Sequence, residues 1–191
     1  MRSCRRDAWR SRIAHRTAGL KQWTSLCTLA VALAACAQPS RPETAPAGMD
    51  TGTNFALHRA ATGSPICKPG EEAEKAVNGL VASWTHDKFC SLHTPAWLQV
   101  DLGRERNVRR FIVKHAGAAG EAGSMNTRAF RISTSRDGQA WDTVVEVRDN
   151  TRDVSEHDIA PRAARYVRLD VSVPTQLPGD PATRIYELEV R

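Results

Sequence analysis

The segment from Tyr166 to Val173 constrains the fold most strongly, because its apolar and polar side chains alternate at every position. A period of two is the pattern of a β-strand with one buried and one solvated face. One face carries Val167, Leu169, Val171 and Val173, and the other carries Arg168, Asp170 and Ser172. The segment therefore predicts a strand that packs against a core.

Five shorter apolar or alternating runs are separated by turn residues. They span residues 97–103, 108–113, 130–133, 141–147 and 185–190, and Asp137-Gly138 marks a turn before one of them. Between residues 54 and 191 no segment has the apolar spacing of an amphipathic helix. Short strands with frequent turns predict an all-β sandwich or barrel, formed by a single domain.

The positive net charge of +6 belongs to the N-terminal region and not to this domain. Of 27 Lys and Arg and 21 Asp and Glu, seven basic residues and one acidic residue lie in residues 1–35, so residues 36–191 carry 20 of each. Nucleic-acid binding needs a clustered positive face. The balanced charge of the remaining chain therefore predicts no nucleic-acid partner.

Residues 1–35 have the order of a secretory signal: an Arg-rich start, a short apolar run from Trp23 to Ala35, and small residues at its end. The run is shorter than the ~20 residues that span a bilayer. The sequence Leu33-Ala34-Ala35-Cys36 resembles a bacterial lipobox, which implies that Cys36 carries a lipid. Ordinary cleavage and secretion is the alternative, because Ala35-Cys36-Ala37 also fits a signal-peptidase site.

Residues 36–53 contain three prolines among small and charged residues, which predicts a flexible tether. The expected organisation is a leader over 1–35, a tether over 36–53 and a domain over 54–191. With a lipid on Cys36 the protein is expected at the cell envelope, in contact with a membrane only through that anchor. Without the lipid it is expected to be secreted.

Two cysteines remain in the predicted domain once Cys4, Cys27 and Cys36 are assigned to the leader and the anchor. Cys67 and Cys90 form an even pair in an exported domain, which favours a disulfide. The alternative is a metal site, although neither cysteine has the second close ligand pair that such sites use.

Six motifs occur in order along residues 54–191. They are Asn54-Phe55-Ala56-Leu57, Lys75-Ala76-Val77-Asn78-Gly79 with Ser83-Trp84, residues 97–103 (WLQVDLG), residues 133–141 (SxSxDGxxW), residues 164–169 (ARYVRL), and residues 184–190 (RIYELEV). This ordered set resembles the discoidin family, also called coagulation factor V/VIII type C domains, and most closely its family 32 carbohydrate-binding modules. The resemblance implies an eight-stranded jelly-roll β-sandwich, of the galactose-binding-like type, with its termini close together.

The resemblance also implies a structural Ca²⁺ site. The family's ligands are backbone carbonyls, a carboxylate, a hydroxyl and a glutamate, and they fall on Lys75, Asn78, Ser83, Tyr186 and Glu187. Oxygen ligands of this kind suit calcium. Asn78 stands where the family usually has Asp, so one negative charge is lost and weaker affinity is expected. The alternative is that Asn78-Gly79 is an ordinary turn.

The family's sugar site lies on loops at one end of the sandwich, and its positions match His86, His115, Asn126 and Arg128. These side chains can bond to sugar hydroxyls, and the rings of Trp84 and Phe89 are candidates for stacking. The alternatives are structural: His115 can stabilise its own loop, Arg128 can pair with Glu121, and Trp84 can belong to the core.

The sequence predicts a binding protein and not an enzyme. It contains neither a Gly-x-Ser-x-Gly elbow nor a His-Glu-x-x-His helix motif. The expected function is non-catalytic carbohydrate binding at the cell envelope, with a glycan as ligand and a glycosidase as a candidate partner. The alternative is a domain for protein or lipid interaction, or adhesion, that binds no sugar.

Overall fold

The computed structural model describes residues 52–81 and 87–191. The leader over 1–35, the lipidation site Cys36 and nearly all of the tether lie outside these residues, as do Ser83, Trp84 and His86. None of the described helices has the length and apolar character needed to cross a membrane.

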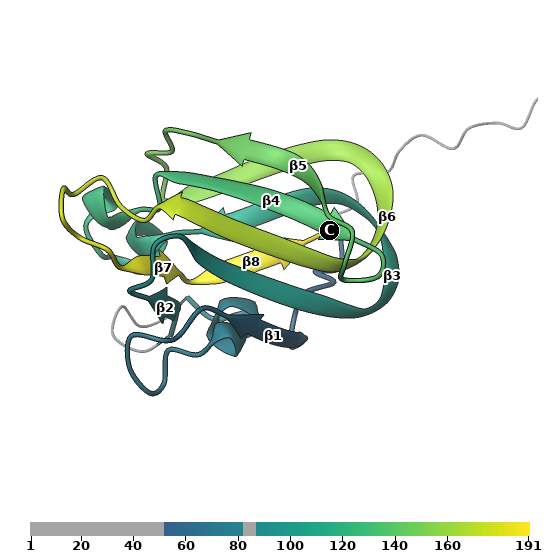
Figure 1. Ribbon diagram of the computed structural model, residues 1–191, viewed down its shortest axis with the longest axis horizontal. Helices are drawn as coiled ribbons and strands as arrows, with labels where there is room; N and C mark the ends of the chain where they lie inside the picture. Colours follow the sequence, from purple (N-terminus) through teal and green to yellow (C-terminus); the bar gives the residue numbers. More distant parts are fainter. Residues whose placement is uncertain (1–51, 82–86) are drawn as a thin grey trace, which may run out of the picture. The chain divides into compact units, whose positions relative to one another are not determined.

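The described chain is built of strands and three short 3₁₀ helices, so the predicted all-β class is confirmed (Figure 1). The strands are β1 (Ala60–Gly63), β2 (Phe89–Ser91), β3 (Ala96–Lys114), β4 (Ala129–Ser135), β5 (Asp142–Val147), β6 (Val154–Val173), β7 (Thr183–Ile185) and β8 (Glu187–Val190). The helices are η1 (Ala73–Val77), η2 (Ala116–Ala119) and η3 (Gly123–Met125).

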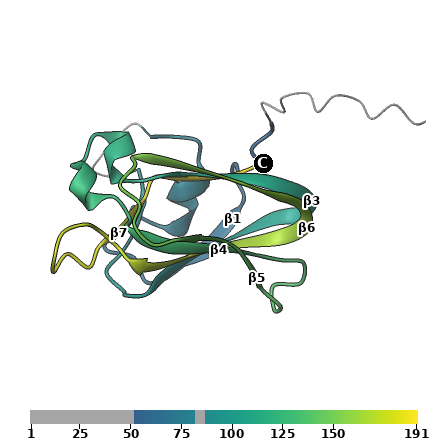
Figure 2. The ribbon, with the colours of Figure 1, turned by 90° about the horizontal axis from the view of Figure 1, so that it is seen from above.

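The two long strands, β3 and β6, bend and pass through both layers of the sandwich. The first half of β3 pairs with β1 and with the second half of β6, which continues to β4 and β5. The second half of β3 pairs with β8 and with the first half of β6. The register breaks between Asp101 and Arg106, around Gly103 with its φ of +80°. Figure 2 shows the two layers joined by this bend.

The core lies between these layers, and the alternation of β6 places its side chains as predicted. Val167, Leu169 and Val171 are buried and Arg168 points outward, where its guanidinium lies 4.7 Å from the ring centre of Trp97. Val173 is 39% exposed, because it is the last residue of β6 and the chain leaves the sandwich there.

The two ends of the domain differ. At one end, on the left of Figure 1, η2, η3, β2, β7 and the loop between β6 and β7 lie together; this is called the loop end below. At the other end the segment before β1 meets the end of β8, where Asn54 Oδ1 accepts a hydrogen bond of 3.0 Å from the Val190 amide. This end, with the β3 and β6 bends, is called the terminal end, and it confirms the expected closeness of the domain's termini.

Candidate functional site

Three of the four predicted sugar contacts are described, and two of these three are fully buried. His115 and Asn126 both have an exposed fraction of 0%. Neither side chain can reach a sugar at the surface, so the prediction that they contact a ligand is wrong. Both hold the loop that follows β3 in place.

His115 continues the buried face of β3, on which Phe111 and Val113 also lie. Its ring centre is 5.6 Å from that of Phe130, and its Nε2 is 3.0 Å from Ser155 Oγ. Nδ1 is buried and has no hydrogen-bond partner among the described residues. Burial lowers the pKa of His115 to about 4, so the ring is neutral at pH 7.

Asn126 ties η2 to the segment before β6. Its Oδ1 accepts a hydrogen bond of 2.7 Å from the Gly117 amide, and its Nδ2 donates to Asp153 Oδ1 at 2.8 Å. A Cβ on Gly117 would collide with the Asp153 carboxylate, so a larger residue there would displace that carboxylate from Asn126. Asn126 is therefore a structural residue whose side-chain capacity is used within the loop.

Arg128 is exposed, but its Nε lies 2.8 Å from Asp149 Oδ1 and not near Glu121. Its backbone amide donates to Val173 O at 3.0 Å, which fixes it beside the end of β6. It does not line the depression described next. Phe89, a candidate for stacking, is 1% exposed and belongs to the core, so that prediction is also wrong.

A depression of about 440 Å³ opens at the loop end. Its polar lining includes Glu71, Lys88, Glu121 and Arg184, and its apolar lining includes Leu92 and Met125. These residues come from four separate parts of the chain that the fold brings together. The volume falls within the range of small-ligand sites in proteins.

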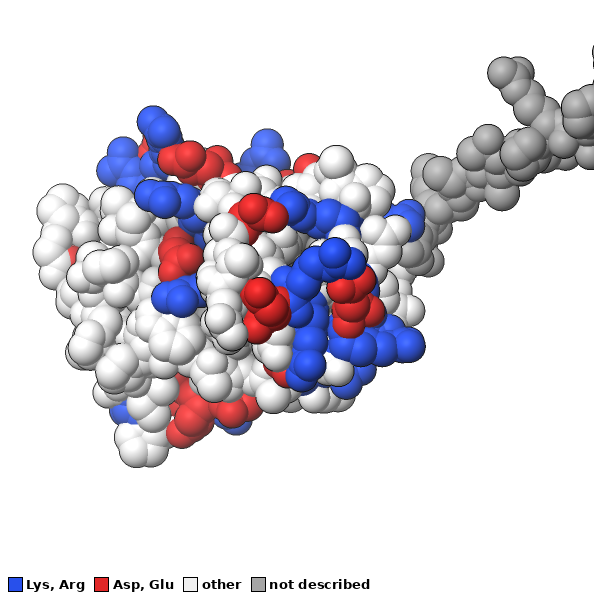
Figure 3. Space-filling view, turned by 45° about the vertical axis from the view of Figure 1, so that its right-hand side comes forward, with Lys and Arg blue, Asp and Glu red and all other residues white. Residues whose placement is uncertain are grey.

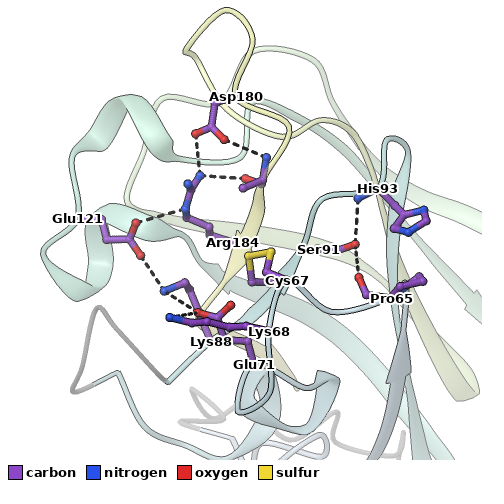
Figure 4. Close-up of a disulfide and its surroundings, with 12 residues drawn as sticks. Pro65, Cys67, Lys68, Glu71, Lys88, Ser91, His93, Glu121, Asp180 and Arg184 are labelled. Atoms are coloured by element: carbon purple, nitrogen blue, oxygen red, sulfur yellow. Dashed lines mark hydrogen bonds and ion pairs between the residues drawn. A yellow bond between two sulfur atoms is a disulfide. The ribbon is translucent and has the colours of Figure 1, made fainter.

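Glu121 is the centre of an ion-pair network in this depression (Figure 4). One carboxylate oxygen lies 3.3 Å from Lys88 Nζ and accepts a hydrogen bond from the Tyr186 hydroxyl. The other oxygen lies 3.4 Å from Arg184 Nε. Glu71 approaches Lys88 Nζ to 3.4 Å from the other side.

The network is balanced in charge and poorly hydrated. The Lys88 and Glu121 side chains are 8% and 9% exposed, and Arg184 has a second partner in Asp180 at 2.9 Å. Buried charges are tolerated when they are paired in this way. Burial and the nearby Glu121 carboxylate raise the pKa of Tyr186, which keeps its hydroxyl protonated. The site thus offers fixed donors and acceptors of the kind that bind vicinal hydroxyl groups.

The disulfide between Cys67 and Cys90 is confirmed and forms part of the wall of the depression. The Cys67 amide donates to Cys90 O, and the Cys90 amide donates to Glu71 O. The bond thereby holds the Glu71 segment against β2. The two sulfurs and a Glu71 oxygen lie within 4.8 Å of one another, but the sulfurs are bonded to each other and are not thiolates, which excludes the alternative of a cysteine metal site.

Sequence analysis missed Glu71, Lys88 and Arg184, and it named Glu121 only as a partner of Arg128. One signal was present, since Glu121 is the only charged residue in the loop from 116 to 126. Arg184 opens the last of the six family motifs, but that motif gives no indication that its side chain faces Glu121.

The predicted calcium ligands are partly brought together. The amide of Gly79, which follows Asn78, donates to both carboxylate oxygens of Glu187 at 3.2 and 3.1 Å. Lys75 lies in η1, Asn78 is the C-cap of this helix, and Tyr186 directly precedes Glu187. Ser83 is outside the described residues.

Asp87 is a further member of this group that the sequence did not suggest. Its Oδ1 accepts a hydrogen bond of 2.6 Å from Asn78 Nδ2, while its Oδ2 is buried without a partner among the described residues. Burial raises the pKa of Glu187 to about 7. Asn78 Oδ1 accepts a hydrogen bond of 2.8 Å from the Leu80 amide. The two buried carboxylates of Asp87 and Glu187 are oxygen donors of the kind that suit a hard cation such as Ca²⁺.

Comparisons with known proteins agree on the kind of domain. Residues 75–169 match the family model described as NedA-like, galactose-binding domain. The family 32 carbohydrate-binding module of EndoD from Streptococcus pneumoniae is 28% identical, with 73% of this chain and 99% of that chain covered and a TM-score of 0.66. No curated protein matches the sequence significantly.

Two further solved structures are similar. A labelled variant of chitosan-binding module 1 from a chitosanase/glucanase of Paenibacillus sp. IK-5 is 27% identical, with 72% of this chain and 96% of that chain covered and a TM-score of 0.58. The lectin domain of Lectinolysin, solved with Lewis B antigen, is 22% identical, with 73% and 96% covered and a TM-score of 0.61. At that identity the last similarity concerns the fold alone.

Proposed function

We propose that the chain is a galactose-binding, discoidin-type domain, as its match to that family model and its similarity to the EndoD module indicate. It binds a carbohydrate without catalysing a reaction, with the sugar held in the loop-end depression beside Glu121. The observation that carries the proposal is the paired, largely buried set of Lys88, Glu121 and Arg184 in a concave site. Charged side chains already fixed by one another lose little freedom when they bond to hydroxyl groups.

The apolar side chains in the lining complement this network. Leu92 is 55% exposed and Met125 lies half-buried beside Glu121 in the depression. They offer a surface to the C–H face of a sugar ring while the charged groups contact its hydroxyls. A shallow site of this size buries little area, so weak affinity is expected.

The test is a glycan-array screen of residues 50–191, followed by titration of each hit with variants. Glu121→Gln removes a charged acceptor and is expected to weaken binding about tenfold or more. Arg128→Gln is the matched control, because Arg128 is a charged loop residue outside the depression. Binding lost in Arg128→Gln and kept in Glu121→Gln would instead favour the site predicted from sequence.

Glu121→Gln also removes an anion from a buried network, so its thermal stability is measured alongside. Met125→Ala supplies a second variant that leaves every ion pair of the network intact. It is expected to weaken sugar binding with little change in melting temperature. A folded domain that binds no glycan on a broad array contradicts the proposal and favours protein interaction or adhesion.

We also propose that Asn78, Asp87 and Glu187 contribute to a Ca²⁺ site. Asp87 would restore the negative charge that is lost where Asn78 replaces the usual Asp. A bound cation would offset the burial of both carboxylates and fix Gly79 and the start of β8. The ion would act as a structural element, at a site separate from the sugar-binding depression.

Thermal denaturation with added CaCl₂ or with chelator tests the ion site. Calcium is expected to raise the melting temperature, and Asp87→Asn to reduce that rise. Glu74→Gln, an exposed neighbour on η1, is the control and is expected to keep it. If the unaltered domain has the same melting temperature in calcium and in chelator, the proposed Ca²⁺ site is contradicted.

The proposed setting is the bacterial cell envelope, with the domain carried on a lipid at Cys36 through the tether. A glycosidase is proposed as a partner, because the similar chitosan-binding module belongs by name to a chitosanase/glucanase. Labelling of the full chain with a radioactive fatty acid, compared with Cys36→Ala, tests the anchor. Release of the variant into the medium is the expected result.

A further inference from the structure

Four arginines at the terminal end have no ion-pair partner among residues 52–81 and 87–191. They are Arg59, Arg104, Arg106 and Arg109. The carboxylates nearby are already engaged by other arginines: Asp101 by Arg165 and Glu105 by Arg136, each through two hydrogen bonds. The terminal end therefore carries an excess of positive charge. Figure 3, in which this end comes forward, shows Lys and Arg side chains gathered there.

The fold forces three of these arginines together. Arg59 precedes β1 and lies over Gly103 at the bend of β3, where a Cβ would come within 3.0 Å of its Nη1. Arg106 follows the same bend and stacks on Phe55, with its guanidinium carbon 5.2 Å from the ring centre. Partial burial, with the charges of Arg104 and Arg59, lowers the pKa of Arg106. The cluster is thus under mutual repulsion.

A second observation shows that the cluster lacks a partner. The Nε–H groups of Arg59 and Arg106 are buried and donate no hydrogen bond to any of the described residues. An unpaired guanidinium group costs stability unless an anion or water approaches it. Phosphate oxygens are well suited, since they meet guanidinium groups in paired hydrogen bonds.

We propose that this terminal end, through Arg59, Arg104, Arg106 and Arg109, docks on the anionic phosphate headgroups of a membrane surface. The choice of a membrane rests on the proposed lipid anchor, whose tether enters the domain at this end, beside Phe55 and Val190. The tether that the sequence predicts over residues 37–53 would reach roughly 20–25 Å. The anchor would therefore hold the domain within reach of the surface at a millimolar effective concentration.

Docking in this way has a consequence for sugar binding. The terminal end and the loop end lie at opposite ends of the sandwich (Figure 1). With the arginines on the membrane, the depression around Glu121 points away from the cell. The domain would present its sugar site outward even though its tether is short.

The test is co-sedimentation of residues 50–191 with vesicles of phosphatidylcholine alone or with ~30% phosphatidylglycerol. These residues suffice, because the core of the described chain lies between Ala56 and Val190, and 73% of this chain covers 99% of the EndoD module. Each arginine near an anionic surface strengthens binding about fivefold at low salt. The double variant Arg104→Gln/Arg109→Gln removes two exposed arginines and is expected to weaken binding to the anionic vesicles about 25-fold.

The matched control is Arg131→Gln with Arg152→Gln, which removes two exposed arginines away from the terminal end. Binding that needs phosphatidylglycerol, falls in the first pair and persists in the control supports the proposal. The proposal is overturned if both double variants lose vesicle binding equally, or if the unaltered domain shows no preference for anionic vesicles. Displacement by inorganic phosphate at constant ionic strength also overturns it, because it indicates a discrete phosphate site. None of these outcomes depends on glycan binding.

Discussion

The neutral, buried ring of His115 makes the stability of the domain dependent on pH. Between pH ~4 and ~6.5 this histidine is neutral in the folded protein and charged in the unfolded chain. The unfolded state then binds more protons, so the free energy of unfolding falls as the pH falls through this range. Lowering the pH from ~7.5 to ~5 is expected to cost about 2 kcal/mol through His115 alone.

Other buried groups titrate in the same range, so the prediction is a difference between two proteins. His157, whose pKa is lowered by burial, adds a change of the same sign. Glu187 acts in the opposite direction, because its raised pKa gives stability below pH ~4.5 that is lost as the pH rises through about 7. The unaltered domain can therefore show a nearly flat profile, and only removal of His115 reveals its share.

The assay is urea denaturation of the unaltered domain and His115→Phe at several pH values between ~5 and ~7.5. Phenylalanine keeps a ring against Phe130, and Ser155 keeps His157 as a hydrogen-bond partner at 3.1 Å. Relative to the variant, the unaltered domain is expected to lose about 2 kcal/mol more on acidification. Parallel pH profiles for the two proteins would refute the buried, neutral state of His115.

Two further predictions concern the loop end. Replacing both Cys67 and Cys90 by serine is expected to lower the free energy of unfolding by about 3 kcal/mol, because the bond closes a separation of 23 residues. Thermal denaturation checks this: the unaltered domain, once reduced, should melt at the same temperature as the variant. Gly117→Ala is expected to destabilise by about 3 kcal/mol through its collision with Asp153, whereas Gly120→Ala, with a φ of +86° and open space around it, should cost only about 1 kcal/mol. Equal losses in these two variants, measured by urea denaturation, would contradict the assigned contact.

The alternation of apolar side chains predicted the strands well, because it reports directly which face is buried. The same alternation could also have placed His115, which continues the face of Phe111 and Val113. It was assigned to the sugar site because of its position in the resemblance. A position within a family motif does not show whether a side chain has solvent access in this chain.

The depression at the loop end could not be predicted in the same way. Glu121, Lys88 and Arg184 lie far apart in the sequence, and nothing local shows that their side chains meet. Such a network depends on how three loops pack, and the disulfide and the Asn126 hydrogen bonds decide that packing. The sequence supplies the charges, and only the tertiary structure determines their pairing.

Pairing also changes what the balanced charge of residues 36–191 means. Equal numbers of basic and acidic residues argued against a broad positive face. At the loop end the charges are matched, since Lys88 and Arg184 share Glu121 and each has a second carboxylate partner, Glu71 or Asp180. At the terminal end Asp101 and Glu105 pair with Arg165 and Arg136, and four other arginines have no ion-pair partner in the part of the chain that the structure describes. Because interactions in physiological salt extend only about 8 Å, a surface responds to this local imbalance and not to the total. A neutral domain can thus have one end suited to uncharged sugars and another suited to anions.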